Sequence, residues 1–165
     1  MAPRPHVIDL PPPSPEETLV HMGRLANEAQ ADPQLRLLVE DIVREVYPHD
    51  YLSEYMAIYH WVQMNVRYTR DPVTVEQLKT PAAVLRTRAA DCDCIATLLA
   101  AMVGVVGGKS RFVAGAFRAG VLEHVWCEVY EPRSKAWVVL DPVPGRRVQQ
   151  MLGRVVDSIV APGVG

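Results

Sequence analysis

The fold is decided by the stretch Asp91-Cys92-Asp93-Cys94-Ile95-Ala96-Thr97-Leu98-Leu99-Ala100-Ala101-Met102-Val103-Gly104-Val105-Val106. From Cys92 to Val106 its side chains are apolar almost all round a helix, and Asp91 stands where a side chain can cap the first turn. A helix without a polar face must be buried on all sides. The sequence therefore predicts a central helix that the other elements enclose, and glycines at 104, 107 and 108 mark its end.

Four further helices are expected before this one. They share one kind of start, a side chain that can accept a hydrogen bond from a first-turn amide, and proline follows three of these side chains. The starts are Ser14, Asp32, Asp50 and Thr80, and the helices end near Ala31, before Pro48, near Asn65 and near Leu85. Glu17 completes a capping box with Ser14. The second helix has the most regular apolar face, made of Leu35, Leu38, Val39, Ile42, Val43 and Val46.

Strands are expected after the central helix. Runs rich in β-branched and aromatic residues cover Arg111–Phe117, Val121–Tyr130 and Ala136–Leu140, and the turn residues 131–135 join the last two as an antiparallel hairpin. Prolines at 142 and 144 stop the sheet, and Val148–Ile159 can form a last amphipathic helix. These elements predict an α+β fold in which helices pack on one side of a small antiparallel sheet.

The composition restricts the kind of protein. The chain has 165 residues, 49% hydrophobic and 22% charged, with a net charge of -2 and no block of like charge. We therefore expect a single globular domain over 15–165 and neither nucleic acid nor a membrane surface as a partner. Six prolines in the first fifteen residues predict that 1–14 is an extended arm. Without a signal peptide or an apolar spanning segment, the expected location is the cytoplasm, where the three cysteines stay as free thiols.

Cys92 is the candidate nucleophile because it opens the central helix. Unpaired amides and the helix dipole stabilise negative charge there, so we expect a lowered thiol pKa and an oxyanion site at the first amides. Of the five histidines, only His124 lies within a predicted strand, and it is the candidate base. Asp141 ends the neighbouring strand and is the candidate for orienting the imidazole.

The hairpin register decides whether this base and carboxylate meet. A turn centred near Arg133 places Trp126 opposite Asp141, with His124 as its diagonal neighbour on the same face. A slip of one residue would move Asp141 to the other face. Trp126 shares the face of His124 and is therefore a candidate substrate contact.

Other interpretations of the thiols remain open. Cys92 can be a small buried hydrophobe, as most free cysteines are. Cys94 lies about 200° further round the helix and is expected in the core, whereas Cys127 is expected to pack on the strand face opposite His124. A zinc site formed by Cys92, Cys94, His124 and Cys127 is chemically permitted, but strand alternation and helix geometry separate these ligands, so we expect no metal.

The motifs also resemble a known family. Asp91–Ala96, then His124-Val125-Trp126, then Trp137–Pro142 are similar in order to the transglutaminase-like branch of the papain-like cysteine fold, particularly its bacterial and phage-type members. Asn65–Tyr68 and Lys79-Thr80-Pro81 also fit that pattern, whereas Ala90 replaces the usual glycine and Cys94 a commoner acidic residue.

The resemblance implies a cofactor-free enzyme that cleaves or transfers amide bonds through an acyl-thioester. It would be a protease or amidase, or a transglutaminase-like acyltransferase, acting on protein or peptide substrates with Cys92, His124 and Asp141 as its triad. The alternative is a catalytically silent interaction module, or a virion-associated one, that retains the same fold.

Overall fold

A computed structural model describes residues 13–70, 78–119, 122–143 and 157–165. In chain order the elements are α1 (Pro15–Ala29), α2 (Pro33–Ile42), α3 (Tyr51–Asn65), β1 (Arg67–Tyr68), α4 (Pro81–Thr87), β2 (Ala89–Ala90), α5 (Cys92–Val105), β3 (Ser110–Ala116), β4 (His124–Glu131), β5 (Ala136–Leu140) and β6 (Asp157–Pro162). Most of the predicted arm, residues 1–12, lies outside the described residues.

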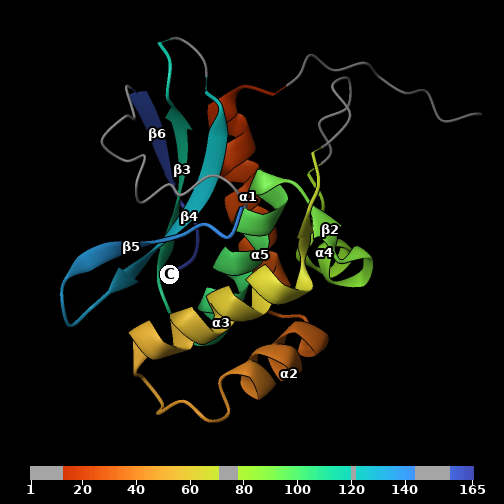
Figure 1. The fold of residues 1–165 in the computed structure, drawn as a ribbon, viewed down its shortest axis with the longest axis vertical. Helices are drawn as coiled ribbons and strands as arrows, with labels where there is room; N and C mark the ends of the chain where they lie inside the picture. Colours follow the sequence, from red (N-terminus) through yellow and green to blue (C-terminus); the bar gives the residue numbers. More distant parts are fainter. Residues whose placement is uncertain (1–12, 71–77, 120–121, 144–156) are drawn as a thin grey trace, which may run out of the picture.

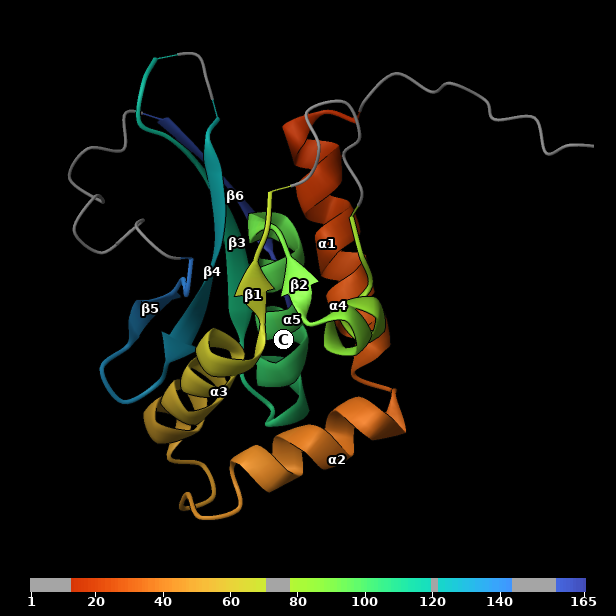
Figure 2. The ribbon, with the colours of Figure 1, turned by 45° about the vertical axis from the view of Figure 1, so that its right-hand side comes forward.

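Helix α5 is the centre of the molecule, as its composition predicts. Every residue from Cys94 to Val103 is buried. Figures 1 and 2 show α5 between the larger sheet and helices α1, α3 and α4, and it also contacts α2. One apolar core cluster includes residues of α1 to α5 and of the sheet, so the helices and the sheet are held together by shared burial.

The larger sheet has the strand order β5-β4-β3-β6, and every neighbouring pair is antiparallel. The alternate residues Val125, Cys127 and Val129 of β4 pack into the core cluster, whereas Trp126 belongs to a separate small cluster with Val113. Strands β1 and β2 form a second, parallel pair in which Arg67 lies opposite Ala89. The predicted α+β class and the predicted hairpin are therefore confirmed.

The helices start where the sequence predicts, and all but one of the expected capping side chains form a hydrogen bond. Ser14 and Glu17 form the capping box, and the side chains of Asp32, Thr80 and Asp91 each accept a first-turn amide. Asp50 makes no such cap. Its Oδ2 instead accepts the Ser53 hydroxyl at 3.0 Å, which is a local side-chain alternative to capping.

Two predicted helices differ from the structure. Helix α2 ends at Ile42, short of Val46, and the chain continues in turns. The β-branched Val43 and Val46, followed closely by Pro48, give the last predicted turn little helical stability. The helix predicted for Val148–Ile159 is wrong over its described residues, because Asp157–Ile159 belongs to β6, which pairs with the edge of β3. Residues 148–156 lie outside the described part.

Among the described residues, no helix has both the length and the apolar character needed to cross a bilayer.

Candidate active site

Cys92 is the first residue of α5, and Asp91 caps that helix. The residue is partly exposed. Its sulfur lies beside β4, where the backbone N–H of Val125 interacts with it. Since Val125 follows His124 in the chain, the helix start and the predicted base are brought to the same place.

The predicted base and its partner are in direct contact. His124 Nε2 lies 2.7 Å from Asp141 Oδ2, and the two side chains are only 1% and 4% exposed. The register of β4 and β5 pairs Cys127 with Leu140, which, continued by one residue, places Trp126 opposite Asp141 as predicted. A carboxylate buried against one ring nitrogen favours the tautomer that has its N–H there. Nδ1 is then left as the proton acceptor.

Asp141 is held by two further contacts. Its Oδ1 accepts the Val143 backbone N–H at 3.3 Å, and its backbone oxygen accepts the Tyr59 hydroxyl at 3.4 Å. Burial, followed by the charge of Asp141, raises the pKa of Tyr59. No local sequence signal indicates this role of Tyr59, because only the packing of α3 against the end of β5 creates the contact.

The Cys92 thiol and the His124 ring are not joined by a hydrogen bond in the part of the chain that the structure describes. The sulfur contacts the backbone beside His124 instead. Geometry in a free enzyme is often looser than in a complex with substrate.

The expected lowering of the Cys92 pKa is not observed. Burial raises the pKa of this thiol to about 11, and the negative charges of Asp93 and Asp91 act in the same direction. The Val125 N–H opposes them but does not outweigh them. Desolvation and two nearby carboxylates disfavour a thiolate more than the helix start favours it.

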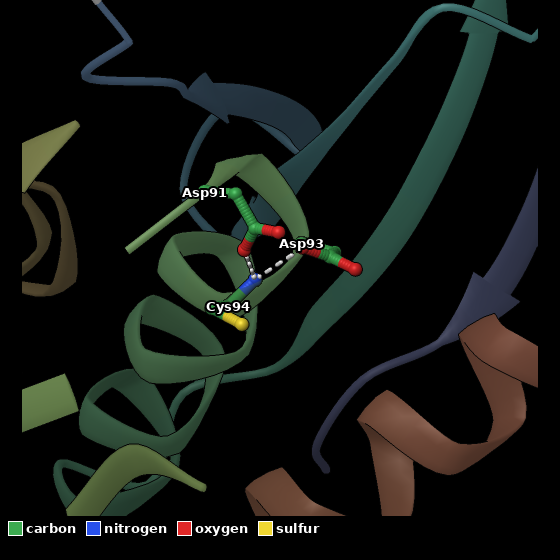
Figure 3. Close-up of side chains that lie close together, drawn as sticks. All are labelled: Asp91, Asp93 and Cys94. Carbon is green, nitrogen blue, oxygen red and sulfur yellow. Dashed lines mark hydrogen bonds between the residues drawn. The ribbon is translucent and has the colours of Figure 1, made fainter. Parts of the chain in front are cut away.

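Asp91, Asp93 and Cys94 form a compact group at the start of α5, shown in Figure 3. The backbone N–H of Cys94 donates to Asp91 Oδ1 at 3.3 Å and to Asp93 Oδ1 at 2.9 Å. Burial, followed by a hydrogen bond with the Asp91 side chain, raises the pKa of Asp93. The two carboxylates can therefore share a proton.

This group is also the one place among the described residues where three possible metal ligands meet, with ligand atoms within 4.8 Å. Within the described residues, no three ligand atoms of Cys92, Cys94, His124 and Cys127 lie that close together. The set that would form the zinc site is thus not brought together.

Cys94, Cys127 and Trp126 are all buried. Cys94 is buried and its sulfur accepts the Lys79 backbone N–H at 3.1 Å. Cys127 is fully buried in the core cluster. Burial raises the pKa of both thiols. Trp126 is only 1% exposed, and its contact with a substrate stays a prediction.

The chain belongs to the transglutaminase-like superfamily, whose family model matches residues 39–142. Over 80 residues it is 30% identical to the peptide-N(4)-(N-acetyl-beta-glucosaminyl)asparagine amidase of Candida albicans, covering 46% of this chain and 20% of the amidase. The chain therefore spans only a fifth of that relative.

Solved structures with the same fold include three bacterial proteins. A candidate protease of Parabacteroides distasonis has a TM-score of 0.64 at 13% identity, covering 90% of this chain and 30% of the other. A candidate cysteine protease of Cytophaga hutchinsonii has a TM-score of 0.57 at 16% identity, with 94% and 53% covered. LapG of Legionella pneumophila has a TM-score of 0.54 at 16% identity, with 78% and 74% covered. At these identities the likeness establishes the fold alone.

Proposed function

We propose that this protein is a cysteine-dependent enzyme that cleaves or transfers amide bonds, with Cys92 as nucleophile, His124 as base and Asp141 as the residue that orients the base. The observation that carries the proposal is the buried His124–Asp141 pair at 2.7 Å beside the strand backbone that contacts the Cys92 thiol. Membership of the transglutaminase-like superfamily supports the same assignment.

The reaction then has two halves. In the first, His124 Nδ1 accepts the thiol proton while Cys92 Sγ attacks the amide carbonyl, and first-turn amides of α5 stabilise the oxyanion. The C–N bond breaks as the imidazolium returns the proton to the leaving amine, which leaves a thioester on Cys92. Because the thiol pKa is about 11, proton removal has to accompany the attack, so His124 acts as a general base.

In the second half, His124 takes a proton from the incoming acceptor, which attacks the thioester carbon. The C–S bond breaks, and the imidazolium returns the proton to the Cys92 sulfur. Water gives a carboxylic acid and makes the enzyme a protease or amidase, whereas an amine gives a new amide and makes it an acyltransferase. We propose proteins or peptides as substrates. The similarity to the fungal amidase adds glycosylated asparagine to the amides worth testing, and the resemblance to bacterial and phage-type members adds virion or host proteins.

Labelling with a chloroacetamide probe tests the nucleophile. The parent protein is expected to react at Cys92, as peptide mapping would show, and Cys92→Ala to lose both labelling and any amide hydrolysis. The thermal midpoint of Cys92→Ala is expected to stay near that of the parent, because Cys92 is partly exposed and contributes little to the hydrophobic core. Cys94→Ala and Cys127→Ala are the controls.

Two results of this experiment would contradict the proposal. Labelling that persists in Cys92→Ala and disappears in Cys94→Ala would show that Cys94, and not Cys92, is the reactive thiol. The second result is a Cys92 that labels no faster than free cysteine at the same pH, in a parent protein that hydrolyses none of a peptide library. That result would favour the alternative, a silent interaction module of the same fold.

We propose that neither a metal nor another cofactor takes part. The carboxylates of Asp91 and Asp93 already accept the Cys94 amide and can share a proton. LapG of Legionella pneumophila has been solved both calcium-bound and EGTA-treated, which makes EGTA the appropriate challenge. Labelling and turnover are expected to be unchanged in EGTA. A loss that calcium restores, but not in Asp93→Asn, would instead place a cation at this pair.

A further inference from the structure

A row of buried polar side chains runs along β4 from the proposed base. His124, Trp126 and Glu128 alternate along the strand and share one face. The rings of His124 and Trp126 are stacked, with centroids 6.0 Å apart and planes 29° apart. The indole N–H of Trp126 donates to Glu128 Oε1 at 3.0 Å. All three residues are buried, so each contact persists without competition from water.

The row is anchored at its far end by an arginine of β3. Arg111 lies opposite Glu128 in the strand register and donates to Glu128 Oε2 from Nε at 2.7 Å, with its terminal nitrogen at 2.6 Å. The two Glu128 oxygens are thus divided between Arg111 and the indole. The Arg111 guanidinium also lies 4.2 Å from the centroid of the Trp137 ring on β5. Contacts from β3, β4 and β5 therefore fix the position of one carboxylate.

We propose that Trp126 and Glu128 are positioning residues for His124: Trp126 sets the plane of the imidazole, and Glu128, held by Arg111, sets the plane of Trp126. This inference rests on the proposed function, in which His124 is the base. It also gives Trp126 a role that is compatible with its burial.

The hydrogen bond to Asp141 does not by itself fix the orientation of the His124 ring. A hydrogen bond at Nε2 fixes one atom of the imidazole, but the ring can still turn about that atom. The direction of Nδ1 depends on this turn, and Nδ1 has to point at the Cys92 sulfur for proton transfer. A stacked ring on one face removes the freedom, provided that the indole itself is fixed, as its hydrogen bond to Glu128 ensures.

Stability alone is a weak explanation for this row. The Arg111 side chain is 32% exposed, and an ion pair that is open to water on one side contributes little to stability. The orientation of the rings is a consequence that apolar packing would not supply. A positioning role therefore predicts an effect on the reactivity of Cys92 that is separate from any loss of stability.

The test measures the rate of Cys92 alkylation by chloroacetamide at neutral pH, together with the thermal midpoint of each variant. Trp126→Leu replaces the ring by a smaller apolar side chain and is expected to slow alkylation about tenfold, as expected when a catalytic group is misplaced. Trp126→Phe restores a ring and is expected to recover most of the rate. Glu128→Gln, which keeps an acceptor for the indole but not the charge for Arg111, is expected to fall between them.

Two controls separate the possible explanations. Val129→Ala shortens a fully buried side chain of the same strand on the face that packs into the core, so it reports the effect of lost stability alone and is expected to keep the parental rate. His124→Ala reports whether alkylation depends on the base at all. An unchanged rate in His124→Ala would overturn the proposed function and, with it, this inference.

A slow His124→Ala together with parental rates in Trp126→Leu and Glu128→Gln would overturn the positioning role and leave the proposed function intact. Equal slowing in Trp126→Leu, Trp126→Phe and Val129→Ala would also overturn it, because the effect would then follow lost stability. If Trp126→Leu fails to fold, the comparison of Glu128→Gln with Val129→Ala still decides between these outcomes.

Discussion

The two faces of β4 make different kinds of contact. On one face, Val125 and the fully buried Cys127 and Val129 pack into the core cluster around α5. On the other, His124, Trp126 and Glu128 are equally buried, yet each has a specific polar or ring contact. The two faces belong to one strand, but they differ in their side chains and in what these side chains contact.

The core face contributes mainly to stability, whereas the other face controls the orientation of side chains. Apolar burial stabilises in proportion to area and without direction, so the core face tolerates small rearrangements. Hydrogen bonds and stacked rings contribute modest net energy but depend strongly on angle. We therefore expect changes on the core face to lower the free energy of unfolding, and changes on the histidine face, defined by His124, Trp126 and Glu128, to lower the reaction rate.

The largest expected effect is at Asp141, the partner of the histidine face. Asp141→Asn keeps the shape but can donate as readily as accept, so the wrong tautomer of His124 can form. Turnover is expected to fall on the order of a hundredfold, about 2.7 kcal/mol of transition-state stabilisation, with little change in KM. The measurement is steady-state kinetics on an amide substrate found by screening the parent protein.

Tyr59→Phe is the matched control for Asp141. It removes only the hydroxyl that donates to the Asp141 backbone oxygen and leaves the carboxylate on His124, so its loss of rate is expected to be much smaller. Parental turnover in Asp141→Asn would contradict the orienting role and require another side chain for it.

The second effect is on the core face. Val129→Ala removes two buried methyl groups and is expected to lower the free energy of unfolding by about 2 kcal/mol. Alkylation of Cys92 is expected to keep its parental rate. Urea denaturation followed by tryptophan fluorescence measures the first quantity, and probe labelling the second. Slower alkylation of Cys92 in this variant would show that the two faces of β4 are not independent.

The smallest effect is on the thiol itself. Asp93→Asn removes a negative charge that raises the pKa of Cys92, while the amide oxygen can still accept the Cys94 N–H. Because less negative charge favours the thiolate, the pKa of Cys92 is expected to fall, by roughly one unit for a charge a few ångströms away. The pH profile of alkylation should move to lower pH by that amount.

Asp32→Asn is the control for this profile. Asp32 caps α2 in the same way that Asp91 caps α5, but its carboxylate is not among the groups that act on the pKa of Cys92. An unmoved profile in Asp93→Asn would mean that Asp93 does not raise the thiol pKa, which would then be raised by desolvation and Asp91 alone.

Much of the fold could be predicted because its signals are local. The central helix follows from an apolar run with a capping aspartate, and the hairpin register from alternation on either side of a short turn. That register brought His124 and Asp141 together as predicted. Helix starts at Ser14, Asp32, Thr80 and Asp91 were also local, since each cap reaches only a few residues along the chain.

The amino-acid sequence by itself thus determined the buried helix, the strand pairing next to it and the order of the candidate site residues. Tertiary structure alone decided the rest. Residues 157–159 became a strand because β3 offered an unpaired edge, and the Cys92 pKa rose because packing removed water and placed two carboxylates nearby. The contacts of Tyr59 with Asp141 and of Arg111 with Glu128 likewise join distant segments. A sequence pattern reports neighbours along the chain, whereas desolvation and contacts between distant segments exist only after folding.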